Sequence, residues 1–305
     1  MAEYQLSEAD RLPLPASYLT EGRQLGLSEP EQQRPFAHFF EPTLRPLQSP
    51  ARDALLAGRV PRELGLEVDD VVRHLSAPGY QGLETGWTRT RGGTLLVACL
   101  TDMPGVTAAM WDWWFGWHST ESARYKLWHP AAHRYSGIAD DRSGDRSLTD
   151  RQRYIGNVSY VDEYVGATYT RLAIRFFDPA RLGFEDSPGT THICARVGLS
   201  DVPVAAGWIV HQVRPTEDGC EMRSRFFLGH AQVLDVPPHS VSEPLAGRVL
   251  TSALGRGALA PVVTAVGRSR TPDAMGHDLL HHCASEMNHL AGFLPALHAE
   301  FRDFP

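Results

Sequence analysis

The sequence predicts an α+β fold in which an antiparallel sheet curls around one long C-terminal helix. Three observations support this prediction: strand-like segments fill the middle of the chain, short turns rich in Gly, Pro or Asp separate them, and one long helical pattern follows. Consecutive strands joined by short turns form an antiparallel meander. A single helix that comes after such strands buries its apolar side against the sheet.

The N-terminal part of the chain differs in composition from the rest. Residues 1–50 are rich in Pro, Arg, Glu and Gln and show no sustained period, so we expect an extended arm with short turns. Two short amphipathic helices are expected next, at residues 51–56 and 66–75. We therefore divide the chain into an N-terminal region, 1–75, which is a candidate dimerisation region, and a main domain, 76–305.

The central segments carry the strand signal. Residues 93–100 (GTLLVACL) form a compact β-type run, after which a helix is expected to begin and to continue through 110–117. From Tyr154 onward the apolar period changes to two, which is typical of strands. A further short helix is expected at 242–254. The strand-like segments are YIGNVSYVDEYVG, ATYTRLAIRFF, TTHICARVGL, AAGWIVHQVRP and GCEMRSRFFLGH.

The C-terminal helix is expected between Thr271 and Phe301. Thr271 suits the N-cap position and Pro272 the first helical position, where no amide hydrogen is needed. Pro295 removes one backbone hydrogen bond, so we expect a kink or break near Ala291. One arc of the helix is apolar and must face a core; its residues are Leu279, Cys283, Met287, Leu290, Phe293, Leu294, Leu297 and Phe301.

This helix also carries a pair of residues of the metal-ligating type. His282 and Glu286 are four residues apart, so they lie one above the other at the edge of the apolar arc, whereas His281 points toward solvent. A neutral imidazole and a carboxylate supply two ligands for a divalent cation. An isolated pair with this spacing is more often a solvated pair or a core histidine, so further ligands are needed to define a site.

Composition and charge exclude several classes of function. The formal net charge of -7 and the sequence pI of about 6.0 give no basic surface for nucleic acid or an anionic membrane, so we expect a small-molecule partner. The four cysteines contain no C-x-x-C pair, which predicts reduced, buried thiols in a cytoplasmic protein. The acidic N-terminus shows no secretory signal, and no apolar run approaches the ~20 residues of a membrane span.

A second unusual stretch lies between Met110 and Tyr135. It holds five of the seven tryptophans of the chain, and a core or an interface is the usual reason for such a density of aromatic residues. Polar side chains interrupt the aromatic residues at spacings of three or four, so several could share one helical face that lines an aromatic pocket. These polar residues are His118, Glu121, Tyr125, His129 and His133.

The strands contribute further candidates. Glu163 alternates with Val161 and Val165, which places a carboxylate on the core-facing side of a strand. Burial of a lone carboxylate is costly unless a cation or strong donors compensate its charge. His211 and His230, on later strands, are expected to face the same cavity. In each case the alternative is that a bulge turns the side chain outward.

Three segments together carry a family resemblance. They are MPGVTAAMWDWWFGWHSTESARYKLWHPAAH, RSRFFLGH and HCASEMNHLAGFLPALH, and with them the chain resembles the diacetylphloroglucinol hydrolase family, which includes phloretin hydrolase. The resemblance covers about residues 76–301 in order, and agreement of three separate motifs by chance is improbable. It implies a helix-grip fold of the Bet v 1 or START kind, with an N-terminal part that helps to form a homodimer.

The resemblance also implies one zinc ion per subunit, bound by two histidines and two glutamates. His129 is the alternative to His133 as the first ligand. We prefer His133 because it stands eight residues after Tyr125, as the family's ligand does after its corresponding tyrosine. An open coordination position for water or a substrate oxygen would make such a site catalytic. The four ligands, matched by motif, are His133, Glu163, His282 and Glu286.

The activity that the resemblance implies is zinc-dependent hydrolysis of the carbon–carbon bond between the ring and the acyl group of polyhydroxylated aryl ketones. Tyr125 and His211 are then expected to contact substrate hydroxyls and to deliver protons. His230 stands where the family carries a tyrosine that contacts substrate, so we expect this chain to differ in substrate identity. The expected pocket-lining residues, for two of which core packing is the alternative, are His129, Trp117 and Phe227.

Two other functions fit the same residues. Proteins in which a curled sheet wraps around a helix also bind hydrophobic ligands without catalysis, because a fold does not fix a function. Two histidines and a carboxylate also bind iron in non-haem oxygenases that act on aromatic substrates. Four coincident ligand positions favour a metal enzyme over a simple binding protein, and metal analysis with a test of oxygen dependence separates zinc from iron chemistry.

Overall fold

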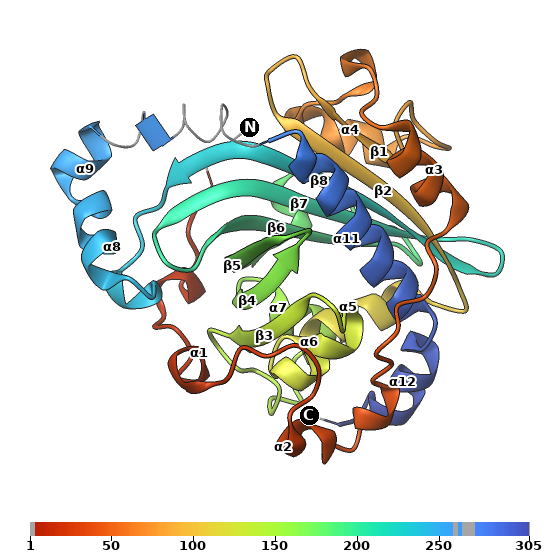
Figure 1. Cartoon of the computed structure of the whole chain (residues 1–305), viewed down its shortest axis with the longest axis horizontal. Coiled ribbons are helices and arrows are strands. Elements are labelled where there is room, and N and C mark those ends of the chain that lie inside the picture. The colour runs from red at the N-terminus through yellow and green to blue at the C-terminus, as the bar shows by residue number, and fades with distance from the viewer. Residues whose placement is uncertain (1–3, 259–261, 264–271, 305) are drawn as a thin grey trace.

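The computed structural model describes residues 4–258, 262–263 and 272–304. Its main feature is an eight-stranded, wholly antiparallel sheet in the order β1-β2-β8-β7-β6-β5-β4-β3, which curls strongly along its length (Figure 1). The strands are β1 Gly86–Arg89, β2 Leu95–Pro104, β3 His133–Ile138, β4 Val158–Val165, β5 Thr168–Phe177, β6 Thr191–Leu199, β7 Val204–Pro215 and β8 Gly219–Val233.

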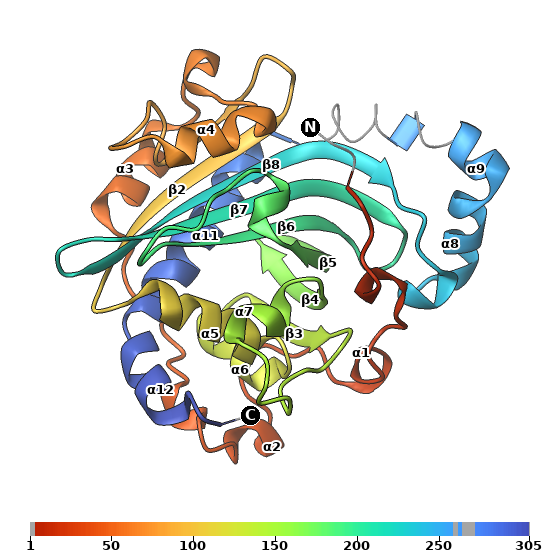
Figure 2. The same cartoon turned by 180° about the vertical axis from the view of Figure 1, so that it is seen from behind.

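The long helix α11, Ala274–Ala291, lies across the concave side of this sheet, as Figures 1 and 2 show from opposite sides. This arrangement confirms the predicted fold class. The helix ends at Ala291 and a shorter helix, α12 Leu294–Phe301, follows with Pro295 in its first turn, so the predicted break is also confirmed. His281 is exposed as expected, and the proposed cap Thr271 lies outside the described residues.

The remaining helices cover the edges and ends of the sheet. The helix expected at 51–56 is confirmed as α3, and α4 begins five residues after the expected start because a 3-10 turn, Val68–Asp70, precedes it. The bounds of the helices other than α11 and α12 in the described residues are α1 Ser17–Thr20, α2 Glu29–Gln32, α3 Ser49–Ala57, α4 Val71–Ser76, α5 Ala108–His118, α6 Ser122–Trp128, α7 Asp150–Tyr154, α8 Pro244–Thr251 and α9 Ala253–Ala258.

The stretch from Met110 to Tyr135 is divided between two helices and a strand. We expected several of its polar residues to share one helical face, but α5 ends at His118, α6 carries Tyr125 and ends at Trp128, and His133 begins strand β3. Pro130 explains the break, since a proline disfavours helical geometry in the residue before it, here His129. Strand β3 then pairs with β4 so that His133 lies opposite Glu163.

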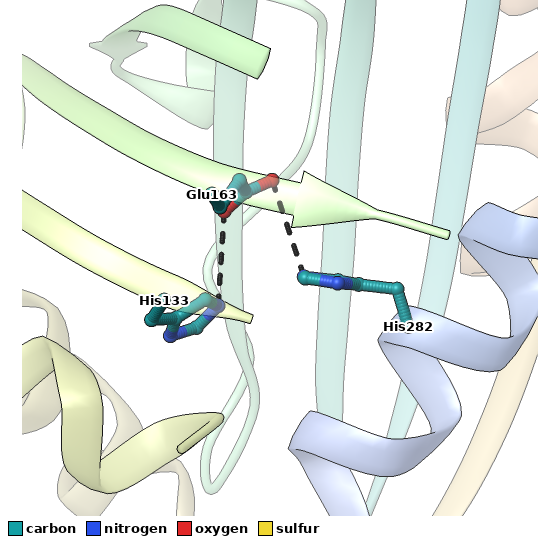
Figure 3. A group of neighbouring side chains, drawn as sticks. All are labelled: His133, Glu163 and His282. Carbon is teal, nitrogen blue, oxygen red and sulfur yellow. Dashed lines mark ion pairs between the residues drawn. The ribbon is translucent and has the colours of Figure 1, made fainter. Parts of the chain in front are cut away.

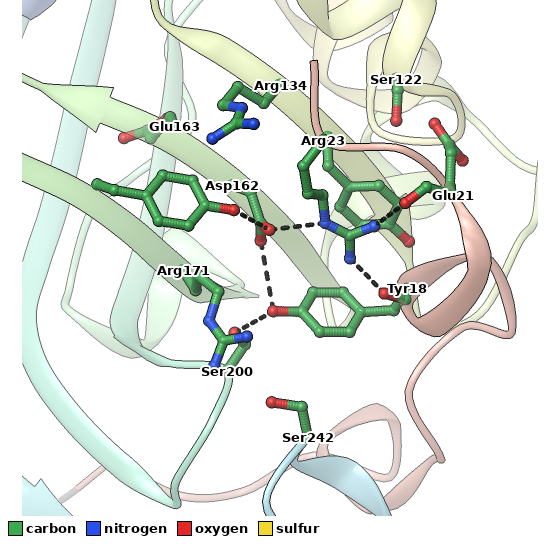
Figure 4. A network of polar contacts seen from close by, with 12 residues as sticks. Tyr18, Glu21, Arg23, Ser122, Arg134, Asp162, Glu163, Arg171, Ser200 and Ser242 are labelled. Atoms are coloured by element: carbon green, nitrogen blue, oxygen red, sulfur yellow. Dashed lines mark hydrogen bonds and ion pairs between the residues drawn. The ribbon is translucent and has the colours of Figure 1, made fainter.

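The N-terminal arm lies against the main domain and is tied to it by buried charges. Arg23 Nε donates to Asp162 Oδ2 at 2.8 Å, and Tyr18 donates to Oδ1 of the same carboxylate at 3.3 Å (Figure 4). Lys126, almost fully buried in α6, donates to both oxygens of Glu31 at 2.8 Å. The arm therefore contacts both β4 and α6, while the domain boundary at residue 75 stays a prediction.

The structure also bears on the predicted thiols and on the possibility of a membrane-spanning helix. The four cysteines are free and buried, which confirms the prediction of reduced thiols. Within the described ranges, every helix is too short or too polar to cross a lipid bilayer.

Candidate active site

Three side chains from three elements meet inside the curled sheet. His133 at the start of β3, Glu163 on β4 and His282 on α11 place their ligand atoms within 4.8 Å of one another (Figure 3). His133 Nε2 lies 3.7 Å from Glu163 Oε2, and His282 Nε2 lies 3.9 Å from Glu163 Oε1. The two histidines thus approach one carboxylate from different sides.

Glu286 completes this cluster one helical turn after His282. Its Oε2 lies 3.5 Å from His133 Nε2 and 3.6 Å from His282 Nε2. Nitrogen and oxygen ligands bound at about 2.0–2.1 Å in a tetrahedron lie roughly 3.4 Å apart. The observed separations are close to this value, so the four side chains are candidates to hold one small divalent cation, with His133, Glu163 and His282 the set whose ligand atoms all lie within 4.8 Å of one another.

The hydrogen bonds and the burial of the two histidines suit them as candidate metal ligands. His133 Nδ1 lies 2.9 Å from the Tyr125 carbonyl oxygen, and donation to that oxygen leaves the Nε2 lone pair for the cluster. This Nε2 is buried and has no hydrogen-bond partner. Burial lowers the pKa of His133 well below 6.5 and also lowers the pKa of His282, whose ring bonds to the backbone of Tyr164. Both rings are therefore neutral, the form that binds metals.

The two buried carboxylates of the cluster also need a compensating positive charge or a proton. Glu163 and Glu286 are only 8% and 7% exposed. Burial, followed by the charge of Glu163, raises the pKa of Glu286 well above 4.5. Two carboxylates in one buried site repel each other unless a proton or a metal ion compensates their charge. A divalent cation supplies that compensation, so the residues present fit a metal ion.

Tyr125 is joined to this cluster from α6. Its hydroxyl donates to Glu163 Oε2, and its ring stacks on His133 at 3.6 Å between centroids with an interplanar angle of 3°. Burial, followed by the negative charge of Glu163, raises the pKa of Tyr125 well above 10. The phenol therefore keeps its proton at physiological pH, directly beside the candidate metal centre.

A cavity of about 360 Å³ opens beside the cluster between the sheet and α11, a volume typical of small-molecule sites. Its polar lining residues are His118, Tyr125, Ser159, Glu163, Thr170, His211, His282 and Glu286. The other lining residues are apolar and come mainly from the strands; they include Phe115, Trp128, Val161, Leu172, Ile174, Val197, Ile209, Phe226, Leu228, Met275 and Leu279. The cavity therefore combines a candidate metal centre with apolar walls.

Two neutral histidines lie in the cavity lining beside Tyr125 and Phe115. Burial lowers the pKa of both His118 and His211 to about 3. His118 Nδ1 donates to the Trp114 carbonyl at 2.7 Å, which leaves Nε2 as an acceptor. His211 was expected in the cavity, and its Nδ1 hydrogen-bonds Ser224 Oγ at 2.8 Å. His118 was among the polar residues expected to line an aromatic pocket, but it received no role in the reaction, because its place next to Tyr125 depends on how α5 packs against α6.

Two residues of β8 do not reach the cavity, contrary to expectation. Phe227 packs in a separate core cluster, in agreement with its core-packing alternative, while its neighbour Phe226 lines the cavity. His230 also lies outside the lining, and its Nε2 hydrogen-bonds Thr94 Oγ1 at 3.0 Å. Gly229 has a φ of 96°, and this local irregularity breaks the alternation that otherwise puts residue 230 on the face of Phe226.

Trp117 and His129 are likewise outside the cavity lining. Trp117 packs among aromatic residues on the far side of α5, with ring centroids 5.2 Å from Phe36 and 5.0 Å from Trp113. The core-packing alternative therefore describes its position. His129 stacks on His282 at 4.8 Å, behind the ligand cluster. The structure thus brings His133 rather than His129 to Glu163.

The fold and the site together define a class of protein: a helix-grip fold that encloses an apolar cavity with a two-histidine, two-glutamate candidate metal centre. The family model described as DAPG hydrolase PhiG domain matches residues 66–299. The chain therefore belongs to the DAPG hydrolase family.

Named relatives agree with this family. The chain is 30% identical over 280 residues to a 2,4-diacetylphloroglucinol hydrolase from Pseudomonas protegens, covering 88% of this chain and 85% of that protein. It is 28% identical over 293 residues to a phloretin hydrolase from Eubacterium ramulus, covering 93% and 96%. Among solved structures, two of norcoclaurine synthase from Thalictrum flavum, one of them a point mutant, match 62% and 59% of this chain and 98% and 91% of their own. Their identities are 14% and 12% and their TM-scores 0.29 and 0.26.

Proposed function

We propose that this chain hydrolyses the bond between a ring carbon and the acyl carbonyl carbon of polyhydroxylated aryl ketones, acylphloroglucinols among them. The observation that carries the proposal is the convergence of His133, Glu163, His282 and Glu286 beside Tyr125 in an apolar cavity. Family membership supports it. In the reaction, water adds to the carbonyl carbon, and the ring carbon leaves with the bonding electron pair and takes up a proton. The products are a carboxylic acid and the deacylated phenol.

The four clustered side chains would hold one divalent ion, which we propose to be zinc because two imidazoles and two carboxylates are ligands that zinc commonly takes. When bound, the ion supplies Lewis acidity for the acyl carbonyl and lowers the pKa of water toward neutrality. The neutral imidazoles and the spacing of the ligand atoms support this assignment.

The chain's own residues then position substrate and hold protons. Tyr125 keeps its proton at Oη, beside Glu163, where it can be passed to the ring carbon or to a developing oxyanion. His118 and His211 are neutral and offer ring nitrogens to the phenolic hydroxyls of the substrate. The apolar walls exclude bulk water, which strengthens these polar contacts.

Substitution of Tyr125 by phenylalanine tests the proton-holding role. We expect Tyr125→Phe to lower kcat by on the order of 10²-fold, because one positioned proton donor is lost, with metal content unchanged. Steady-state kinetics and metal analysis on the same preparation measure both quantities. Tyr80→Phe, at a residue that is 62% exposed, is the control. Equal kcat in Tyr125→Phe and the wild-type protein would remove Tyr125 from the mechanism.

The proposed function is tested by metal analysis together with an assay of mono- and diacetylphloroglucinol with and without chelator. We expect one zinc per chain and release of acetic acid that stops when the metal is removed and resumes when zinc is restored. Turnover under strictly anaerobic conditions would exclude an oxygen-dependent iron enzyme, and the metal analysis distinguishes zinc from iron. Zinc-loaded protein that binds these ketones without cleaving them would instead identify a binding protein. A homodimer and a cytoplasmic location stay predictions from the sequence, and light scattering tests the first.

A further inference from the structure

We propose that the preferred substrates of this site carry an acyl group much longer than acetyl, with an alkyl or arylalkyl chain bound along the apolar part of the cavity. This inference rests on the proposed function, because it assumes that the acyl carbonyl lies at the candidate metal centre. It concerns which aryl ketone is cleaved, and it follows from the distribution of polar atoms in the cavity.

The polyhydroxylated ring requires the polar side of the cavity. A phenolic hydroxyl buried without a partner costs free energy, so the ring is expected where donors and acceptors lie. His118 lies next to Tyr125, with ring centroids 5.8 Å apart, and Phe115 lies 5.4 Å from His118 and 6.3 Å from His211. These contacts place His118 and His211 together on the α5–α6 side of the cluster. The ring therefore points to this side.

The acyl group must then extend in the other direction, where the walls are apolar. On α11, Leu279 and Met275 continue the face of His282 toward the N-terminal end of the helix, and both line the cavity. Seven residues of helix separate Met275 from His282, which corresponds to about 10 Å. An acetyl methyl group covers only a small part of such a stripe.

The sheet wall opposite this helical stripe is apolar as well. Val161 and Val165 flank Glu163 on β4, and all three line the cavity. Thr170, which pairs with Glu163, donates its hydroxyl to the Glu163 carbonyl at 3.2 Å, so this polar group is already used within the sheet. The Ser159 hydroxyl is buried without a partner, and it is one polar atom in a wall that is otherwise made of hydrocarbon.

Small residues in the sheet create the space for a chain. Ala195 and Gly207 line the cavity where the neighbouring positions carry larger residues such as Val197 and Ile209. A Cβ on Gly207 would lie 2.7 Å from the Phe227 carbonyl oxygen, so the backbone of β8 keeps this position without a side chain. An acyl chain can lie along the cavity wall at these small residues, and burial of each methylene is expected to improve binding about fourfold.

The experiment is a chain-length series on the metal-loaded protein. Acetyl-, butanoyl- and hexanoylphloroglucinol are compared by kcat/KM and by Kd, the latter from quenching of the fluorescence of tryptophans such as Trp128, which lines the cavity. We expect both quantities to improve with each added methylene, by on the order of 10²-fold from acetyl to hexanoyl. A flat or falling series in an enzyme that cleaves acetylphloroglucinol would overturn this inference and leave the proposed function intact.

Two variants in the sheet wall test the location of the chain. Val197→Phe narrows the apolar part, so the hexanoyl-to-acetyl ratio of kcat/KM is expected to fall at least about tenfold, whereas Leu172→Ala widens it and should favour still longer chains. Leu199→Phe, at a residue that is 38% exposed on the same strand as Val197, is the matched control and should leave the ratio unchanged. An unchanged ratio in Val197→Phe, with thermal melting like that of the control, contradicts the assignment.

The binding data separate the two proposals. If no acylphloroglucinol is cleaved but Kd still improves with chain length, the proposed function fails while the chain-binding site stands. If cleavage occurs and neither Kd nor kcat/KM depends on chain length, the proposed function stands and the chain-binding site fails.

Discussion

Replacement of His282 by alanine is expected to remove both the metal ion and the hydrolytic activity. His282 supplies one of the two neutral imidazoles of the cluster, and its Nε2 lies 3.6 Å from Glu286 and 3.9 Å from Glu163. Without it, three ligands remain and two buried carboxylates lose much of their compensation. Because Lewis acidity contributes several kcal/mol to such reactions, we expect kcat/KM to fall by on the order of 10³-fold or more.

The neighbouring residue provides a matched control for this experiment. His281 lies on the same helical turn but is exposed to solvent, so His281→Ala should keep both metal and activity. Metal content by mass spectrometry and hydrolysis rates are measured on the two variants in parallel. A His282→Ala protein that retains stoichiometric metal and full turnover would show that the cluster is not the catalytic centre.

Replacement of Glu84 by glutamine is expected to destabilise the protein by about 3–5 kcal/mol, because it removes the partner of two buried charges. Arg223 and Arg225 on β8 have side chains with no exposed surface, and their Nη2 atoms lie 2.6 Å from the two carboxylate oxygens of Glu84. A neutral amide leaves both guanidinium groups buried without a counter-charge. Urea unfolding measures the loss of free energy, and exposed Glu63→Gln should stay within about 0.5 kcal/mol of the wild-type protein.

The Glu84 carboxylate also makes the free energy of unfolding depend on pH. Burial alone raises the pKa of Glu84, but the hydrogen bond from Arg223 and the charge of Arg225 outweigh it and lower the pKa to about 2. Because the folded-state pKa lies below the unfolded value of about 4.3, this contribution is present above that value and is lost as the pH falls toward 2. Unfolding experiments between pH 5 and 2 should show a smaller decline for Glu84→Gln than for the wild-type protein. Parallel curves for both proteins would contradict the assignment.

Elements with a strong local pattern could be predicted from the sequence, and elements defined by their partners could not. The five strands from β4 to β8 alternate clearly, and α11 combines an apolar arc with a proline that ends it. Strand β1 has only four residues, and β3, with the sequence HRYSGI, shows no alternation of apolar residues. Both become strands through pairing, with β2 and β4, which the period of a single segment does not encode.

The residues of the candidate site were likewise predictable only where a local pattern places them. The spacing of His282 and Glu286 and the alternation around Glu163 indicated three buried candidate side chains from local geometry, whereas His133 was preferred through the family motif because its strand was hidden. The prediction that His230 faces the cavity is wrong because Gly229, with a positive φ, shifts the alternation of side-chain directions on β8. Counting by two along a strand assigns faces correctly only up to the first such irregularity.

Asp162 and Glu163 stand side by side on β4 but point to opposite faces of the sheet, one toward the arm residue Arg23 and the other toward His133. A slip of one residue in the pairing of β4 would exchange these two carboxylates, along with every other side chain of the strand. Arg23, Tyr18 and Tyr169 all donate to Asp162 and therefore stabilise only the correct alignment. The contacts that Arg23 and Tyr18 of the N-terminal arm make with Asp162 thus favour the alignment of β4 in which Glu163, the longer carboxylate, faces the cavity.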